Sequence, residues 1–137
     1  DAELPASLRL ASMRLARRLR LERGRDDLTL SQLAVLGSLD RHGPATPGEL
    51  AEIERVRPPS MTRIVNSLEE AGLVVRRPHP TDGRQVIVEL TDQAHVLVDD
   101  DRRRRTAWLA LQLDELTADE RDALRVAAPL LDRLAGS

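Results

Sequence analysis

A change of hydrophobic period within residues 55–90 constrains the fold more than any other feature of the sequence. Apolar residues first recur at helical spacing, which predicts an amphipathic helix, and Gly72 stands where a left-handed residue commonly ends a helix. Two short apolar runs, 73–75 and 86–88, then flank a polar loop and predict a β-hairpin. The apolar residues at helical spacing are Met61, Ile64, Val65 and Leu68.

A short helix is expected just before this amphipathic helix. Thr46 suits the N-cap, Pro47 suits the first helical position, and Glu49 completes a capping box. A tight turn at residues 55–59 then leads to the amphipathic helix, expected over about 58–71. A short helix, a tight turn and a second helix have the proportions of a helix-turn-helix.

Longer amphipathic helices are expected on both sides of this module. The first covers about residues 4–21, and a polar connector at 23–27 leads to a second helix that Thr29 caps. Thr91 is expected to cap a long helix over about 92–114. These elements make the chain mainly α-helical, with a single small β-hairpin.

The end of the chain adds a last helix, which a capping box at Thr117 and Glu120 begins. Pro129 lies inside the helical pattern and is expected to kink or break this helix. In the preceding long helix, three aspartates at 99–101 stand four residues before arginines at 103–105. Such i,i+4 pairs stabilise an exposed helix, so we interpret this run as a solvated face.

The outer helices carry apolar residues on more than one side. Small flanking helices cannot bury two apolar faces by themselves, so we expect the chain to form a homodimer. The alternative for the first helix is that it packs only on the core of its own chain. The leucines expected in the dimer contact are Leu8, Leu15, Leu109, Leu113, Leu124 and Leu131.

The composition narrows both the fold class and the function. With one Trp, no Phe and no Tyr, the core must consist of Leu, Val and Ala, which favours helices and leaves little for base stacking on aromatic side chains. The absence of Cys excludes zinc fingers, disulfides and thiol chemistry. No apolar run approaches the roughly 18 residues of a membrane span, and no signal peptide is visible. We therefore expect a cytoplasmic protein that does not contact a membrane.

The sequence shows no arrangement typical of an enzyme or of a bound cofactor. It contains no nucleophile–base pair, phosphate-binding loop or set of metal ligands. The histidines, His42, His79 and His95, stand far apart on different expected elements and predict no metal site. We therefore expect neither catalysis nor a cofactor.

The distribution of charge indicates DNA binding although the net charge is −2. Residues 55–84 hold six arginines and three acidic residues, so this segment is basic within an acidic chain. A helix that can lie in a groove, followed by a basic hairpin, predicts a DNA-binding module. The arginines are Arg55, Arg57, Arg63, Arg76, Arg77 and Arg84.

At this point the chain resembles the MarR family of bacterial transcription regulators over nearly its whole length. Residues 61–65 with 68–74 are similar to the family's recognition helix and its exit. Residues 76–78, then Asp82-Gly83-Arg84, then 88–91 are similar to its wing. The resemblance implies a winged helix-turn-helix flanked by N- and C-terminal dimerisation helices.

The resemblance also implies a division of the chain and a mode of action. Residues 28–90 would form the DNA-binding part, and residues 1–27 and 91–137 would form the dimer. Each subunit would bind half of a pseudo-palindromic operator in double-stranded DNA. Family members usually repress genes, and many release DNA when a small phenolic or other anionic aromatic effector binds.

The helix expected over 58–71 should enter the major groove. Ser60, Thr62 and Arg63 are the main candidates for contact there, and Asn66 is a weaker one because it lies farther along the helix. Short Ser and Thr side chains suit phosphate or close base contacts. Arg63 can donate to a guanine edge or to a phosphate, and the sequence does not decide between them.

The hairpin tip should reach the minor groove through Arg84, because a narrow A·T-rich groove attracts arginine. By resemblance, Asp82 holds this arginine through a carboxylate–guanidinium contact. The alternative for Asp82-Gly83 is a plain type I′ turn. Arg57 and Arg77 are expected to contact phosphates, and the alternative is that both are simply solvated.

Two further alternatives remain open at the sequence level. Arg76 matches a family position near the ligand region, where it could anchor an anionic ligand or pair with an acidic residue. For the whole chain, the alternative to an operator-binding regulator is a winged-helix module that binds protein. The basic segment 55–84 argues against that alternative.

Overall fold

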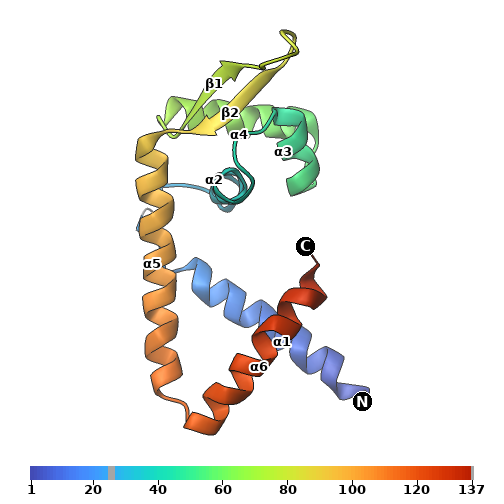
Figure 1. Cartoon of the computed structure of the whole chain (residues 1–137), viewed down its shortest axis with the longest axis vertical. Coiled ribbons are helices and arrows are strands. Elements are labelled where there is room, and N and C mark those ends of the chain that lie inside the picture. The colour runs from blue at the N-terminus through green and yellow to red at the C-terminus, as the bar shows by residue number, and fades with distance from the viewer. Residues whose placement is uncertain (25–26, 137) are drawn as a thin grey trace. The chain divides into compact units, whose positions relative to one another are not determined.

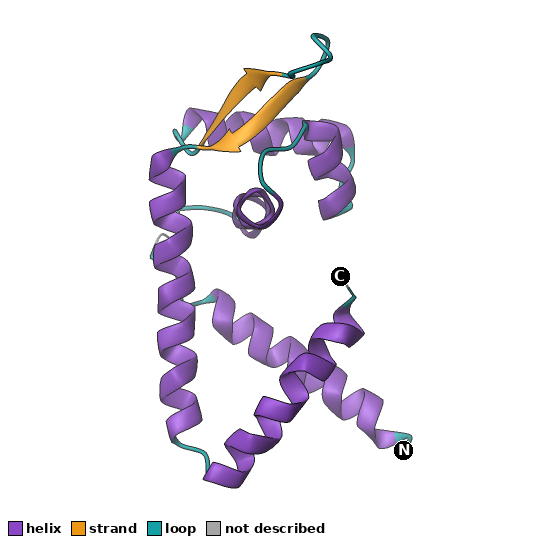
Figure 2. Cartoon of the chain, viewed as in Figure 1, coloured by secondary structure: helices purple, strands orange, loops and turns teal. Residues whose placement is uncertain are grey.

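The computed structural model describes residues 1–24 and 27–136 and is mainly helical, with one two-stranded antiparallel sheet (Figures 1 and 2). This confirms the expected fold class. None of the described helices is both long and apolar enough to cross a membrane. The elements are α1 (Glu3–Arg20), α2 (Leu30–His42), α3 (Pro47–Glu54), α4 (Pro58–Glu70), β1 (Val74–Pro78), β2 (Val86–Leu90), α5 (Asp92–Asp114) and α6 (Ala118–Ala135).

The chain divides into two compact units. The winged unit comprises residues 23–102, and the terminal-helix unit comprises residues 1–22 and 103–137. Helix α5 contributes its first part to the winged unit and its last part to the terminal-helix unit. Within the connector expected at 23–27, residues 25 and 26 lie outside the described residues.

The expected capping boxes form and fix where three helices begin. Thr46 accepts the N–H of Glu49 at 3.1 Å, and the Glu49 carboxylate accepts the N–H of Thr46 at 3.1 Å. The same reciprocal pair forms at Thr117 and Glu120, and Thr29 is capped in this way by Gln32. Each box satisfies two main-chain N–H groups that would otherwise lack partners at a helix start.

The core of the winged unit is aliphatic, as the shortage of aromatic residues requires. Met61, Val65 and Leu68 form the buried stripe of α4, each with 0% exposure. They pack with residues from α2, α3, the hairpin and the start of α5. The other members with 5% exposure or less are Leu28, Val35, Leu36, Leu39, Ala45, Leu50, Ala51, Leu73, Val74, Val88 and Ala94.

The two strands pair in antiparallel register from Val74↔Leu90 to Pro78↔Val86. Both strands extend two or three residues beyond the apolar runs at 73–75 and 86–88. Leu73 itself is not part of β1, because its N–H donates to the carbonyl of Leu68 at the end of α4. Main-chain pairing therefore continues into the polar residues that follow each apolar run. The hydrophobic pattern alone could not predict this extension.

A third segment joins the outer edge of β2. Ala45 and Val88 form an isolated antiparallel bridge, in which the Ala45 N–H donates to the Val88 carbonyl at 3.1 Å and the Val88 N–H donates back at 2.8 Å. Ala45 immediately precedes the N-cap of α3. The middle of β2 is thus attached to the residue that precedes the helix-turn-helix.

The acidic run of α5 is not a uniformly solvated face, so this part of the sequence interpretation was wrong. Asp101 is only 4% exposed, and its Oδ1 accepts the N–H of Gly24 at 2.8 Å. Arg102, by contrast, pairs with Asp99 one turn earlier and with Asp40 of α2. The winged unit uses this run to hold the connector and α2 against α5.

The terminal-helix unit has little interior of its own. Among the described residues, neither α1 nor α6 contains a buried residue. Arg18 of α1 lies over the Trp108 ring, 4.4 Å from its centroid. At the junction of α5 and α6, the Arg121 guanidinium donates to the carbonyls of Leu113 and Leu116 at 3.1 and 2.6 Å.

A kink or a break was expected at Pro129, and the break does not occur, because α6 continues through this residue. A proline removes one main-chain hydrogen bond and crowds the preceding turn. Pro129 is exposed, so water can solvate the carbonyl that loses its partner. The helix extends to Ala135.

Candidate nucleic-acid interface

The turn between α3 and α4 is a Schellman motif built without glycine. The Val56 N–H donates to the Ala51 carbonyl at 3.0 Å, and the Arg55 N–H donates to the Glu52 carbonyl at 3.3 Å. Arg55 adopts φ 55° and ψ 44°, the left-handed conformation that favours glycine. This turn ends α3 and sets the direction in which α4 begins.

The start of α4 offers very few main-chain donors. Pro58 and Pro59 have no N–H, and the Met61 N–H donates to the Arg57 carbonyl at 3.0 Å. The N–H of Ser60 is therefore the first-turn donor available for an anion. Arg57, at the N-cap, is exposed and makes no side-chain capping bond.

The surface of α4 opposite the core carries the predicted recognition residues. Thr62, Arg63 and Asn66 are exposed, and Ser60 is half-buried. The Thr62 hydroxyl donates to the Pro58 carbonyl at 3.0 Å, and the Arg63 guanidinium lies 3.4 Å from Ser60 Oγ. Since the Thr62 proton is used within the helix, this side chain offers a methyl group and an acceptor.

Helix α4 ends at a second Schellman motif, with Gly72 at φ 76° as expected. The Leu73 N–H donates to the Leu68 carbonyl at 2.9 Å, and the Gly72 N–H donates to the Glu69 carbonyl at 3.0 Å. Leu68 and Leu73 are both fully buried, which supplies the hydrophobic contact that accompanies this motif. The chain therefore leaves α4 directly into β1.

Arg76 connects β1 to the exposed side of α4. Its Nη1 lies 2.5 Å from Glu69 Oε1, and its Nη2 donates to Asn66 Oδ1 at 2.6 Å. Of the two roles considered from the sequence, these contacts favour pairing with an acidic residue. Arg77, on the opposite face of β1, pairs with Glu89 of β2 while its side chain stays 65% exposed.

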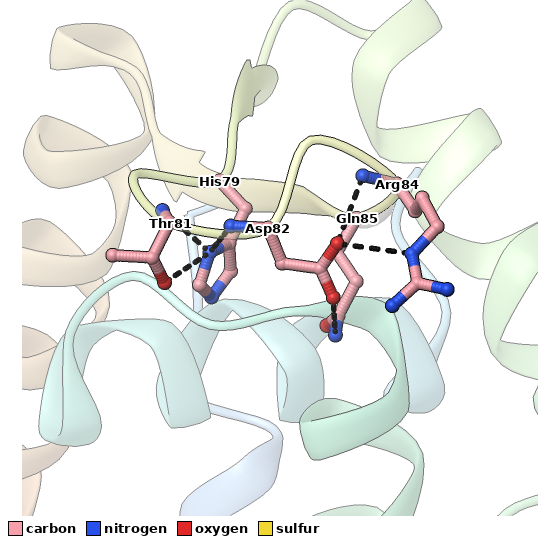
Figure 3. Close-up of polar contacts among 5 residues, drawn as sticks. All are labelled: His79, Thr81, Asp82, Arg84 and Gln85. Carbon is pink, nitrogen blue, oxygen red and sulfur yellow. Dashed lines mark hydrogen bonds and ion pairs between the residues drawn. The ribbon is translucent and has the colours of Figure 1, made fainter.

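Figure 3 shows that Asp82 organises the wing tip. Its Oδ1 accepts the Arg84 N–H at 3.1 Å and the Arg84 Nε–H at 3.3 Å, and its Oδ2 accepts Gln85 Nε2–H at 3.1 Å. The contact with Arg84 is the one that the resemblance implied. The Arg84 side chain is 93% exposed, so the carboxylate restrains an arginine that projects into solvent.

His79 supports the same loop from the other side (Figure 3). Its Nδ1 accepts the main-chain N–H of Thr81 at 3.2 Å and that of Asp82 at 3.0 Å. A nitrogen that accepts hydrogen bonds carries no proton, so in this arrangement the imidazole proton lies on Nε2. From the sequence, His79 was considered only as a metal ligand, and this function was missed.

Two carboxyl groups near the wing have perturbed pKa values. The main-chain N–H of Arg84 is the largest cause that holds the pKa of Asp82 below its usual value, followed by the side chains of Gln85 and Arg84. The Thr46 main-chain N–H, followed by the Thr46 hydroxyl, lowers the pKa of Glu49. Both acids therefore remain ionised throughout the neutral range.

The turn at Asp82-Gly83 is not type I′, so that alternative was wrong. A type I′ turn needs positive φ at both central residues. Among the described residues, Arg55, Gly43, Gly72 and Gly136 have positive φ, and neither wing-tip residue does. The Gln85 N–H donates to the Asp82 carbonyl at 3.1 Å and closes the turn, and the Asp82 carboxylate adds its contacts to this main-chain bond.

The winged unit thus carries all of the side chains that the sequence analysis assigned to DNA. Ser60, Thr62, Arg63 and Asn66 lie on α4, Arg57 lies at its N-cap, and the remaining three lie on the hairpin. The six leucines assigned to dimerisation lie on α1, α5 and α6, and each is exposed or half-buried. Within residues 1–24 and 27–136, no three His, Asp or Glu side chains are grouped as a metal ion would require.

The wing-tip acceptors were only partly visible in the sequence. Asp82 stands two residues before Arg84 and three before Gln85, and such short spacings are typical of a side chain that accepts from the following turn. His79 stands at the same spacing before Thr81 and Asp82. The partners Glu69 and Glu89 carried no local signal, because each contacts an arginine on a different element.

Comparison with known proteins identifies the family. A family model described as MarR family matches residues 28–86. An HTH-type transcriptional regulator of Mycobacterium leprae is 50% identical over 96% of this chain and 92% of its own length. The HTH-type transcriptional repressor MdtR of Bacillus subtilis is 33% identical over 68% of this chain and 60% of its own length.

A solved structure agrees with these matches. The crystal structure of a transcriptional regulator from Pseudomonas aeruginosa superposes with a TM-score of 0.89 at 38% identity. The superposition covers all of this chain and 96% of the other. With its helix-turn-helix, basic wing and matching sequence, the chain belongs to the MarR family of DNA-binding transcriptional regulators.

Proposed function

We propose that this protein is a homodimeric repressor that binds a pseudo-palindromic operator and releases it when a small anionic aromatic effector binds. The observation that carries the DNA-binding part is the arginine arrangement of the winged unit. Arg57 and Arg63 are exposed on the α4 side, and Arg84 is exposed and restrained at the wing tip. Residues 28–90 would therefore form the part that contacts DNA.

In this proposal α4 lies in the major groove and the wing tip reaches the adjacent minor groove. Arg63 and Asn66 would contact base edges, with Thr62 beside them, and Arg84 would enter the minor groove with Asp82 as its support. The Ser60 N–H, Arg57 and Arg77 would bind phosphates. Figure 1 supports this assignment, since the hairpin loop extends beyond the helices of the winged unit.

The dimer is proposed from the apolar side chains of the terminal-helix unit. Residues 1–27 and 91–137 would supply the contact, including the six leucines named above. Burying aliphatic side chains that are now exposed would contribute about 25 cal/mol per Å² of apolar surface. The large exposed apolar residues of α1 and α6 are Leu4, Leu10, Met13, Leu15, Leu124, Val126, Leu130, Leu131 and Leu134.

Repression is proposed from relatives rather than from the geometry. The B. subtilis relative is named a repressor, and a protein that occupies a promoter can exclude polymerase without any further activity.

For the effector, the contacts of Arg76 with Glu69 and Asn66 argue against a ligand anchor at that position, because an anion would have to displace the Glu69 carboxylate.

Selection from a random duplex library tests the operator proposal. We expect a two-fold symmetric consensus with half-sites about one helical turn apart and an affinity that falls steeply with salt, because arginines displace counterions from phosphates. Weak binding that does not respond to salt would refute the proposal and would favour a protein-binding winged helix. Adding simple hydroxybenzoates to the complex then tests whether an anionic aromatic releases the DNA.

Sedimentation tests the dimer. Leu15→Glu combined with Leu131→Glu places charges on α1 and α6 and should yield a folded monomer with lost operator affinity. Leu30→Glu is the matched control, because Leu30 is an exposed aliphatic residue of α2 in the winged unit and lies outside both segments proposed for the dimer contact. A wild-type chain that sediments as a monomer at operator-binding concentrations would overturn the dimer.

A further inference from the structure

The contact of Arg76 with Asn66 fixes which end of the Asn66 amide faces solvent. A guanidinium has only donors, so the group that faces Arg76 Nη2 at 2.6 Å must be the carbonyl oxygen of Asn66. The amide NH₂ therefore points away from Arg76. The orientation of this amide, which is often ambiguous, is determined here by the chemistry of its partner.

Arg76 is itself held in place. Its Nη1 contacts Glu69, and its side chain is 26% exposed, which is low for an arginine at the molecular surface. Asn66 and Glu69 stand one helical turn apart on α4 and lie on the same side of that helix. The guanidinium therefore binds two adjacent positions of α4 from the neighbouring strand.

Asn66 lies among the residues proposed to face the major groove. It stands four residues after Thr62 and three after Arg63, and all three side chains are exposed. The buried stripe of Met61, Val65 and Leu68 occupies the opposite side of the helix. An amide held at this position directs its N–H donors toward a ligand that lies along the exposed side of α4, beside Thr62 and Arg63.

We propose that Arg76 is a positioning residue that holds Asn66 as a hydrogen-bond donor toward a base edge in the major groove. This inference rests on the proposed function. Guanine, adenine and thymine each present an acceptor in the major groove, whereas cytosine presents the N4 amino donor. An amide held in this orientation can donate to guanine, adenine or thymine at the contacted position, but it cannot donate to the N4 amino group of cytosine.

The test measures operator affinity with each of the four bases at every position of one half-site. For the wild-type dimer we expect one position at which cytosine weakens binding by about 5- to 100-fold relative to the other bases. Asn66→Ala should remove this penalty at that position and leave the other positions unchanged. Asn66 is exposed, so this variant keeps the fold.

Arg76→Met separates orientation from contact. With the guanidinium gone, the amide can rotate and accept from cytosine N4, so the penalty at the same position should fall to less than twofold. Arg76→Lys retains a donor and should restore part of the penalty. Arg77→Met is the matched control, since it removes the neighbouring arginine of β1 and should weaken all sequences equally while lowering the salt dependence.

Two results would overturn the inference without touching the proposed function. One is sequence-specific binding by the wild type with a base profile that Asn66→Ala leaves unchanged. The other is an undiminished cytosine penalty in Arg76→Met. Absence of any sequence-specific binding by the wild type would instead remove the proposed function itself, and the inference with it.

Discussion

In the wing tip, the Nε atom of Arg84 lies 3.3 Å from Oδ1 of Asp82, and the same oxygen accepts the main-chain N–H of Arg84 at 3.1 Å. One carboxylate oxygen therefore restrains both the main chain and the side chain of a single arginine. Restraining a long side chain before it binds reduces the conformational entropy that binding would otherwise cost. The arrangement favours insertion of Arg84 into a narrow groove.

Arg84→Ala should weaken operator binding by about tenfold or more, because a charged hydrogen-bonding group would be lost from the complex. The dimer and the thermal stability should stay unchanged, since the side chain is 93% exposed. Fluorescence anisotropy and sedimentation measure the two properties. Arg125→Ala is the control, since Arg125 lies on α6 and its side chain is 73% exposed. Equal affinity of the two variants would exclude Arg84 from the contact.

The Asp82 contacts should persist across neutral pH and disappear only in acid. The pKa of Asp82 is held below its usual value of 3.8, so its hydrogen bonds stabilise the folded loop fully above that value. They are lost as the pH falls through the lowered pKa of the folded state. Hydrogen exchange of the Arg84 amide, corrected for intrinsic rates, should therefore show no change in protection between pH 8 and 5. Loss of protection already at pH 6 would contradict this assignment.

His79→Ala should loosen the wing tip, because the N–H groups of Thr81 and Asp82 lose their acceptor. We expect faster amide exchange at both residues and weaker DNA binding, with little change in the unfolding midpoint. His79→Asn is the informative companion, since the asparagine Oδ1 occupies a place similar to that of imidazole Nδ1. Equal behaviour of the alanine and asparagine variants would show that the acceptor is unimportant.

The two Schellman motifs predict opposite effects on stability. Arg55→Gly relieves a left-handed non-glycine residue and should raise the free energy of unfolding by up to about 1 kcal/mol. Gly72→Ala should lower it by about 1 kcal/mol through main-chain strain, since the added Cβ would lie 3.5 Å from Gln93, an ordinary contact. Urea unfolding measures both, and effects of the same sign would refute the comparison.

Asp101→Ala should destabilise the winged unit by about 1–3 kcal/mol, because the hydrogen bond from the Gly24 N–H to the buried carboxylate would be lost. Asp101→Asn keeps an acceptor for Gly24 and should cost less. Asp99→Ala is the control, since Asp99 is exposed on the same helix and pairs with Arg102, which lies one turn farther along that helix. A loss for Asp99→Ala as large as that for Asp101→Ala would contradict the role of burial.

The features that could be predicted from the sequence are those whose partners lie close together in the chain. The Thr46–Glu49 and Thr117–Glu120 boxes each join residues three apart, and the glycine at position 72 follows the helical repeat directly. Spacing alone encodes such interactions, because a helix start or end brings these groups together in any protein. The hairpin and the mainly helical fold were predicted for the same reason.

The contacts that could not be predicted join distant parts of the chain. Asp101 and Gly24 are 77 residues apart, and nothing in an acidic run distinguishes the one aspartate that packing will bury. Arg76 reaches Asn66 because α4 packs beside β1, and that packing is decided by the core rather than by either residue. Pro129 shows that a local signal can also mislead. A proline inside a helical pattern indicates a break, but α6 is continuous through this exposed residue.

The bridge between Ala45 and Val88 has a mechanical consequence for the hairpin. It ties the middle of β2 to the chain just before α3, whereas Gly83, at the tip of the hairpin, has no neighbouring atom within 4 Å of the position its Cβ would occupy. Main-chain mobility should therefore increase steadily from Val88 toward Gly83, as NMR order parameters would report. A duplex that captures this wing would then have to immobilise only its last few residues, because two main-chain hydrogen bonds already hold β2 to the chain before α3.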